Sequence, residues 1–425
     1  MTLLITHNRY RCIYLLLGIA FLISTIFFSL IPNGHDAPYL PAFAPGIGEF
    51  TSSPTDHNCD PFAQQVHLHF DPVDNLQSYF ATFSPHCKAS SPPWLTQMAE
   101  LGPSEPPVEA LKDKTVLLLG DSLERMLLRD LCNKLRGNFT VHPSDSYAIP
   151  TTQRRPSGGL PRSCRIAGPS GQQGLTIISY FFYGYDEEDM WQDKLATWSY
   201  PPRYSGRWTT FANSAYPSVF GVDGMLAGTP SGERGYPDLV LVNQGLWELA
   251  RFDRLEERSR ADDPPELLVD PITVSPEFMD QYITLTVDFL ARIRALVGDD
   301  ARIRWRQMHT PRAPTGEYFT DPMGTQQKSR ARFTAVKVRV LNEAAAYACQ
   351  LASQAEFERR SENRWAGGED GRITVFPVGD LIDPWPANEW MRDDVHPTIE
   401  AGMAVWGGGM FEFLARTPKP KVKVK

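Results

Sequence analysis

Three residues of this sequence have the side chains needed for nucleophilic acyl transfer: Ser122, Asp393 and His396. A serine hydroxyl becomes a nucleophile when an imidazole takes its proton, and a carboxylate usually orients that imidazole. Asp393 stands three residues before His396, so its carboxylate can accept from Nδ1–H and leave Nε2 facing a serine. The alternative for each is a local role, with Ser122 as a helix cap and Asp393 in an acidic surface turn.

Ser122 is expected at a strand-to-helix turn. The apolar run Thr115–Leu119 is typical of a buried strand, Gly120 and Asp121 break it, and apolar residues at helical spacing follow over Leu123–Leu135. A serine at such a turn lies at the carboxyl edge of a sheet, where its own N–H joins the donors of a helix start. Those donors can stabilise an oxyanion.

His396 is expected at the same edge. It follows the last predicted strand, Ile373–Val378, and Pro397 suits the first turn of the helical stretch after it. His309, at the end of the preceding strand, is a rival base or a polar pocket wall, and no carboxylate adjoins it.

Asn243 ends another predicted strand, Asp238–Val242. Its amide could donate to an oxyanion at the carboxyl edge. The alternative is that Asn243 supports a tight turn before Gly245.

Short apolar strands alternate with helical patterns, which predicts an α/β fold: three α/β/α layers around a mostly parallel, five-stranded sheet. An aromatic insertion, residues 184–237, could offer faces to sugar rings or cover the sheet as additional core. The predicted strands are Thr115–Leu119, Leu175–Tyr183, Asp238–Val242, Arg302–Met308 and Ile373–Val378. The predicted helices are Leu123–Leu135, Pro276–Leu296, Lys328–Gln354 and the segment after Pro397.

Four blocks of this chain, spread over roughly residues 110–415, resemble the SGNH/GDSL hydrolase superfamily. Within it the chain looks most similar to the PC-esterase branch. That branch includes the plant trichome-birefringence-like polysaccharide O-acetyltransferases and the fungal capsule O-acetylation proteins. The blocks are Gly120-Asp121-Ser122 with Arg125, Asn243-Gln-Gly-Leu-Trp247, Trp305-Arg306 and Asp393-x-x-His396-Pro397.

The resemblance implies roles for these residues. Ser122 would be the nucleophile, His396 the base and Asp393 its orienting acid. Asn243 and Gly184 would join the N–H of Ser122 in the oxyanion hole. The third block of the superfamily is usually Gly-x-Asn-Asp, whereas this chain has Asn-Gln-Gly-Leu. The residues expected to support the site are Asp121, Arg125 and Arg306.

The resemblance also implies a function, the transfer or hydrolysis of O-acetyl groups on glycans. Both reactions use one acyl-enzyme, so the triad does not decide between a sugar hydroxyl and water as acceptor. The alternative is a catalytically silent, glycan-binding or structural relative. No cofactor is expected, the acyl donor is not identified, and no cluster of metal ligands supports a metal-dependent hydrolase.

The chain has 425 residues and a net charge of −8, which argues against a nucleic-acid partner because phosphates need a basic face. Its one basic cluster is the C-terminal tail, 419–425. Residues 13–32 carry no charge and are long enough to span a bilayer, with Arg9 and Arg11 before them. A cleaved signal peptide is the alternative to this membrane anchor.

An uncleaved anchor predicts a single-pass type II protein of the secretory pathway, which we expect in the Golgi. Residues 1–12 would be a cytosolic tail, 33–58 a stem, and 59–418 a lumenal domain with a glycosylation sequon at Asn138. Two disulfides and one thiol are expected there. The shortest loops join Cys59 with Cys87 and Cys132 with Cys164, and Cys349 is expected in the core.

Overall fold

The structure is a computed structural model. It describes residues 60–62, 66–82, 89–91, 93–100, 109–142, 161–166, 174–188, 190–191, 203–260, 272–319, 331–362 and 373–416. The chain divides into two units, Met1–Ser53 and Pro54–Lys425, and every described residue belongs to the second. The predicted cytosolic tail, anchor, stem and basic tail lie outside the described residues. Among the helices that the structure does describe, none is both long and apolar enough to cross a bilayer.

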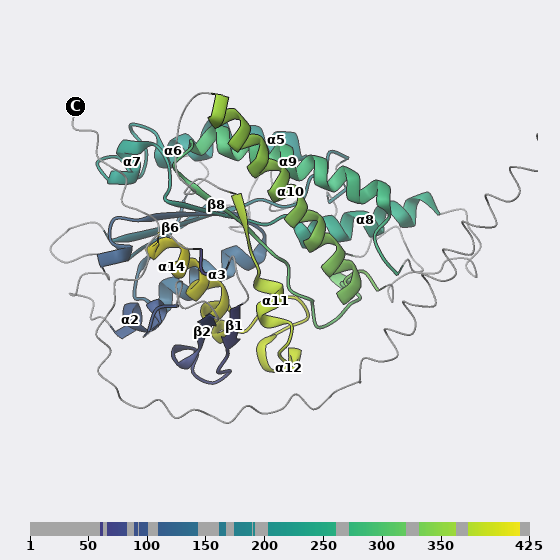
Figure 1. The fold of residues 1–425 in the computed structure, drawn as a ribbon, viewed down its shortest axis with the longest axis horizontal. Helices are drawn as coiled ribbons and strands as arrows, with labels where there is room; N and C mark the ends of the chain where they lie inside the picture. The colour runs from purple at the N-terminus through teal and green to yellow at the C-terminus, as the bar shows by residue number, and fades with distance from the viewer. Residues whose placement is uncertain are drawn as a thin grey trace, which may run out of the picture. The chain divides into compact units, whose positions relative to one another are not determined.

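A seven-stranded sheet forms the centre of the described domain, in the order β4-β5-β6-β3-β7-β8-β9 (Figure 1). The strands from β6 to β9 run parallel, and β5 and β4 extend the β6 edge in antiparallel fashion. The bounds are β3 Thr115–Gly120, β4 Asn138–Val141, β5 Arg162–Ile166, β6 Leu175–Phe181, β7 Leu239–Val242, β8 Arg302–Arg306 and β9 Ile373–Phe376.

The predicted α/β class and mostly parallel sheet are confirmed, and the five predicted strands are the parallel ones. The prediction of five strands in total was wrong, because β4 and β5 add two more. β4 is largely exposed, and β5 has an exposed Arg165 between buried positions. Neither strand has the continuous apolar run by which a buried strand is identified in sequence.

Helices cover both faces of this sheet, as Figure 1 shows, because successive side chains of a strand point to opposite faces. Leu117 and Leu119 belong to one buried cluster, with α8, α9 and α10, while Val116 and Leu118 belong to another, with α3 and α14. α8 is absent from the predicted helices. The bounds are α3 Ser122–Lys134, α8 Gly245–Ser259, α9 Pro276–Val297, α10 Ala335–Glu362 and α14 Gly408–Ala415.

The remaining elements are short. β1 and β2 form an antiparallel hairpin, and the segment that contains it packs through Phe62 and Leu68 onto the cluster around α14. The bounds are β1 Val66–His69, β2 Tyr79–Thr82, α2 Trp94–Glu100, α11 Val378–Ile382, α12 Ala387–Trp390 and α13 Ile399–Ala401. Single-turn 3-10 helices are Asn75–Gln77, Glu109–Leu111 and Glu317–Phe319, and a π-helix, Gly402–Gly407, joins α13 to α14.

The aromatic insertion adds to the core over the sheet. Trp191, Tyr204, Phe211 and Tyr216 are buried in the cluster that contains α9. These rings therefore act as covering core rather than as faces for sugars. Trp198 and Tyr200 lie outside the described residues. The insertion forms α5 Tyr204–Thr210, a π-helix Phe211–Ala215, α6 Tyr216–Phe220 and α7 Pro230–Arg234.

A disulfide joins Cys132 of α3 to Cys164 of β5, one of the two predicted pairs, with Cα atoms 5.6 Å apart. A Cβ on Gly137 would meet both sulfur atoms within 3 Å, so glycine makes room for the bridge. Cys349 is a buried free thiol, as predicted. The other predicted pair lies outside the described residues.

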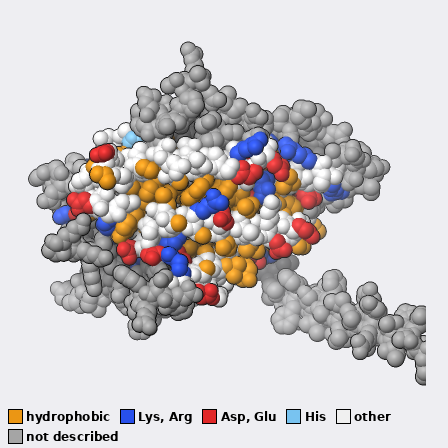
Figure 2. Space-filling model, turned by 90° about the horizontal axis from the view of Figure 1, so that it is seen from above, with side chains coloured by type: hydrophobic (Ala, Val, Ile, Leu, Met, Phe, Trp, Pro, Cys, Tyr) orange, Lys and Arg blue, Asp and Glu red, His pale blue; other side chains and the backbone are white. Residues whose placement is uncertain are grey.

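The surface drawn in Figure 2 mixes Lys and Arg side chains with Asp and Glu, and apolar side chains lie between them. The described part of this face has no extended area of one charge. Positive and negative side chains alternate closely on this face, so their electric fields largely cancel at a distance. This face therefore offers no strong attraction to a polyanion.

Candidate active site

Ser122, His396 and Asp393 lie in a hydrogen-bonded row at the carboxyl edge of the sheet. Oγ of Ser122 is 2.8 Å from Nε2 of His396. Nδ1 of the same ring is 3.0 Å from each carboxylate oxygen of Asp393. An ionised carboxylate only accepts, so Nδ1 carries the proton and Nε2 accepts from the serine hydroxyl. This order of groups is the one that nucleophilic catalysis by serine requires.

Asp121, not Ser122, caps helix α3. The carboxylate of Asp121 accepts from the N–H of Leu123 at 2.9 Å, and Ser122 is the first helical residue. The interpretation of Ser122 as a cap was therefore wrong. With the cap supplied by its neighbour, the Ser122 hydroxyl bonds to His396 instead, and its backbone N–H points out of the helix start.

A tight loop holds Asp393 and His396 together. Oδ1 of Asp393 accepts from the backbone N–H of Val395 at 2.9 Å and of His396 at 2.7 Å. Met391 and Pro397 pair as an isolated β-bridge that closes the loop. The orientation of the imidazole is therefore set by its own loop.

The Asp393 carboxylate is ionised at neutral pH. Its partial burial would raise the pKa of this carboxyl, but the N–H groups of Val395 and His396 and the adjacent imidazole outweigh that effect and hold the pKa below its usual range. The acceptor that orients His396 therefore keeps its charge.

A buried ion pair lies behind the serine. Glu124 completes the capping box of α3 by accepting from the N–H of Asp121 at 3.1 Å, and it pairs with Arg306 of β8. Its carboxylate folds over Gly120, where a Cβ would lie 2.1 Å from Oε2 of Glu124. Gly120 thus gives Glu124 the space to tie the Ser122 turn to β8.

Sequence reasoning missed Glu124 as a supporting residue. The signal was present, since Asp121-x-x-Glu124 fits the spacing of a capping box. Arg306 was expected to support the site, and the structure places it under the Ser122 turn through this ion pair.

Asn243 and Gly184, the two expected partners in the oxyanion hole, are held differently. Nδ2 of Asn243 donates to the Arg306 carbonyl at 2.6 Å, and its Oδ1 accepts from Gly245 N–H at 3.1 Å. An amide nitrogen has two hydrogens, so one remains for an oxyanion. Gly184 has φ +49°, and a Cβ there would lie 2.7 Å from Oε1 of Glu248, so this turn requires glycine.

Arg125, one turn after Ser122, packs its guanidinium over the Phe181 ring at 5.4 Å. Burial lowers the pKa of Arg125, and the charge of Asp121 opposes that shift. Phe181 in turn contacts Trp247 edge-on, and Trp247 contacts the half-exposed Tyr318. An aromatic wall thus borders the β6 side of the site.

His309 supports the loop and is not placed to act as base. It is fully buried, and its Nε2–H donates to the Val395 carbonyl at 2.8 Å. Its ring lies edge-on to Trp390 and Trp406. Burial, aided by nearby positive charge, lowers the pKa of His309 to about 3, so the imidazole stays neutral.

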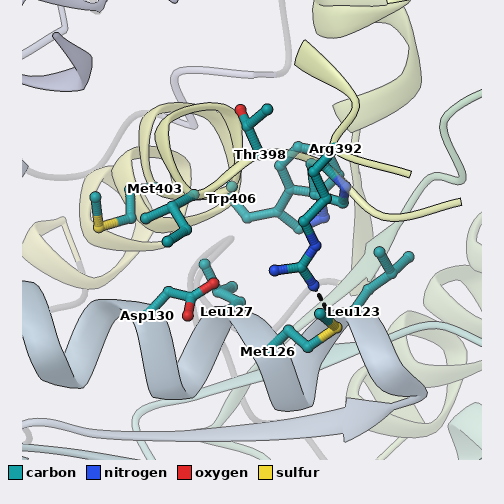
Figure 3. A pocket seen from close by; sticks show the side chains of 11 residues that line it. Leu123, Met126, Leu127, Asp130, Arg392, Thr398, Met403 and Trp406 are labelled. Carbon is teal, nitrogen blue, oxygen red and sulfur yellow. Dashed lines mark hydrogen bonds between the residues drawn. The ribbon is translucent and has the colours of Figure 1, made fainter. Parts of the chain in front are cut away.

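A shallow apolar crevice lies between α3 and the C-terminal helices (Figure 3). Leu127 and Met403 line it from opposite sides, and Nη2 of Arg392 crosses it to the sulfur of Met126 at 2.8 Å. The volume of about 20 Å³ has room for about one water molecule. The crevice is therefore a packing seam that fixes the loop of His396 against α3.

No protein-family model matches this chain, and no curated protein matches it. Across the residues that the structure describes, no group of three or more His, Cys, Asp or Glu side chains is placed to hold a metal ion.

Replacing Gly120 by alanine tests the packing behind Ser122. The added Cβ would displace the Glu124 carboxylate from Arg306, and we expect a loss of about 1–3 kcal/mol in the free energy of unfolding from overpacking. Chemical denaturation measures this loss. Gly402→Ala is the matched control, because its Cβ would meet nothing closer than 3.9 Å and alanine suits a helix better by up to about 1 kcal/mol. Equal stability of the two variants would refute the packing argument.

His309→Gln tests the buried neutral imidazole through pH. An unfolded chain takes up a proton at histidine near pH 6.5, whereas folded His309 does so only at about pH 3. Acid therefore favours the unfolded chain, and this group should remove about 1.4 kcal/mol of stability for each pH unit between about 6.5 and about 3. The free energy of unfolding, measured by chemical denaturation at several pH values, should fall less steeply with decreasing pH in the glutamine variant. The same pH dependence in wild type and variant would show that His309 is not the titrating group.

Proposed function

We propose that this protein is a serine-dependent acyl-transfer enzyme that acts on O-acetyl groups of glycans, as an O-acetyltransferase or an acetylesterase of the SGNH, PC-esterase-like kind. The observation that carries the proposal is the row from Ser122 Oγ through His396 to Asp393, with spacings of 2.8 and 3.0 Å. The four sequence blocks that resemble the superfamily supply the acetyl and glycan part of the proposal.

In the proposed reaction, His396 Nε2 takes the hydroxyl proton as Oγ of Ser122 bonds to the ester carbonyl carbon. The tetrahedral oxyanion accepts from the N–H of Ser122, with the second amide hydrogen of Asn243 and the turn at Gly184 as further candidates. The imidazolium then returns its proton to the leaving oxygen as the ester bond breaks. What remains is an acetyl group on Ser122 and a neutral His396.

The second half of the reaction repeats these steps with a new acceptor. His396 takes a proton from water or from a sugar hydroxyl, and the oxygen attacks the acetyl carbonyl to release Ser122. Water gives hydrolysis and a sugar hydroxyl gives transfer. The arrangement of Ser122, His396 and Asp393 serves either acceptor.

The proposed setting is the lumen of the secretory pathway, with residues 13–32 as anchor. Asn138, the proposed glycosylation site, is exposed at the start of the edge strand β4. The Cys132–Cys164 disulfide agrees with an oxidising compartment.

Acylation of Ser122 is the first test. The full chain treated with p-nitrophenyl acetate should gain one acetyl group on Ser122, detected by peptide mass spectrometry, and should release p-nitrophenol continuously. Ser122→Ala should lose both signals and keep its unfolding midpoint. Ser259→Ala, which removes an exposed serine at the end of α8, is the control and should behave as wild type. A folded wild-type chain that binds glycan but is never acetylated on Ser122 would indicate the alternative, a catalytically silent glycan-binding protein.

Two adjacent aspartates provide a comparison of charge position. Asp393→Asn removes the acceptor of His396 Nδ1–H and favours the wrong tautomer, so kcat should fall by about 10²–10⁴-fold. Asp394 pairs instead with Arg312 at 3.1 Å on the surface, where such a pair contributes about 0–1 kcal/mol. Asp394→Asn should therefore keep kcat within about twofold of wild type. Steady-state ester hydrolysis measures both, and the opposite ranking would assign the orienting role to Asp394.

A further inference from the structure

A hollow formed by described residues lies beside the loop of His396. It is a groove of about 850 Å³, and its lining comes from the N-terminal half of α10, the turn Thr310–Arg312 after β8, and the segment from α11 to α12. Both β8 and β9 end at this groove. It therefore opens at the same carboxyl edge as Ser122, the edge at which ligands of parallel α/β sheets bind.

One wall of the groove is continuous with the loop that carries His396. Trp390 lines the groove, and its carbonyl accepts from Thr398 N–H at 2.7 Å, just after that loop. On the other side Arg312, also in the lining, holds Asp394 of the loop at 3.1 Å. A ligand in the groove would thus lie against the structure that positions the imidazole.

The groove presents carboxylates held at fixed positions. Asp383 accepts from the N–H and the hydroxyl of Thr310, at 3.0 and 2.7 Å. Asp380 accepts from Nε2 of Gln307 at 3.1 Å. A carboxylate has about four acceptor positions, so each retains capacity for further donors. Fixed acceptors of this kind suit the hydroxyl groups of a sugar.

An aromatic side chain completes the lining. The Trp385 ring is half-buried in the groove wall, and it is held by an edge-on contact with Phe70 at 5.9 Å. A rigid indole gives the apolar face of a sugar ring a large contact area at little entropic cost. Trp385 thus adds stacking to the hydrogen bonding of the carboxylates.

The charge of the lining argues against an acidic ligand. Glu343, Asp380 and Asp383 are opposed by Arg312 and Arg339, and Arg312 already faces Asp394. An acidic polymer would meet more negative than positive charge here. A neutral polyhydroxyl chain would meet no repulsion.

We propose that this groove binds the glycan on which the enzyme acts, as a neutral oligosaccharide strand running past the loop of His396. The inference rests on the proposed function, because it names the substrate class of that site. The carboxylates of Asp380 and Asp383 accept from sugar hydroxyls, and the ring of Trp385 stacks on a sugar face.

The test is a binding titration with the full chain carrying Ser122→Ala, which cannot turn over. The probes are neutral oligosaccharides of xylose, mannose and glucose, and oligogalacturonate as the acidic probe. At least one neutral series should bind, and Trp385→Ala should weaken its Kd by about tenfold, as expected for an aromatic contact at the centre of a site. Trp385→Phe should recover part of the loss. Replacing both carboxylates, by Asp380→Asn with Asp383→Asn, should raise Kd by about a further fivefold.

Tyr347→Ala is the matched control, because Tyr347 is exposed on α10 outside the groove lining, and its Kd should equal that of the parent. Unchanged affinity in all groove variants, or tight binding of the acidic probe alone, would overturn the inference. Acetylation of Ser122 in the wild-type chain reports on the proposed function separately. If Ser122 is acetylated normally in the wild-type chain but the groove substitutions do not change glycan affinity, the proposed groove is refuted and the proposed acyl-transfer function is not.

Discussion

The parallel arrangement of β6, β3, β7, β8 and β9 is the constraint on which the site depends. Parallel strands deliver every carboxyl end to one edge, so residues far apart in sequence meet there without any direct connection. Ser122 follows β3, Asn243 follows β7, and the loop of His396 comes soon after β9. Hydrogen bonds between these strand ends, such as Asn243 N–H to the Leu119 carbonyl at 3.0 Å, fix the positions of the strand ends relative to one another.

Strand β8 carries buried charge next to the site. Arg304 and Arg306 are almost completely covered, although isolated charges are costly to remove from water. Arg306 pairs with Glu124 of α3, and Arg304 pairs with Asp60 at 3.3 Å and lies over the Phe413 ring. Asp60 and Phe413 come from opposite ends of the described chain. β8 therefore joins the Ser122 turn, the N-terminal segment and α14 through directional contacts that a purely apolar strand could not make.

The sequence was sufficient for the parallel strands and for four of the five described α-helices with eight or more residues, because their signal is local apolar periodicity. It was also sufficient to predict that Ser122, Asp393 and His396 lie together, because their elements end at a shared edge. It was insufficient for β4 and β5, whose pairing depends on the rest of the sheet. The burial of His309 also could not be predicted, since two tryptophans from the C-terminal part of the chain enclose it.

The separation of 274 residues between Ser122 and His396 has a consequence for the newly made chain. A ribosome adding about 5–20 residues per second needs roughly 14 to 55 s to pass from one to the other. During that interval the serine exists without its proton acceptor, and the sheet face that α14 will cover is still open. In the proposed enzyme, biosynthesis therefore leaves Ser122 without its base until the domain is nearly complete.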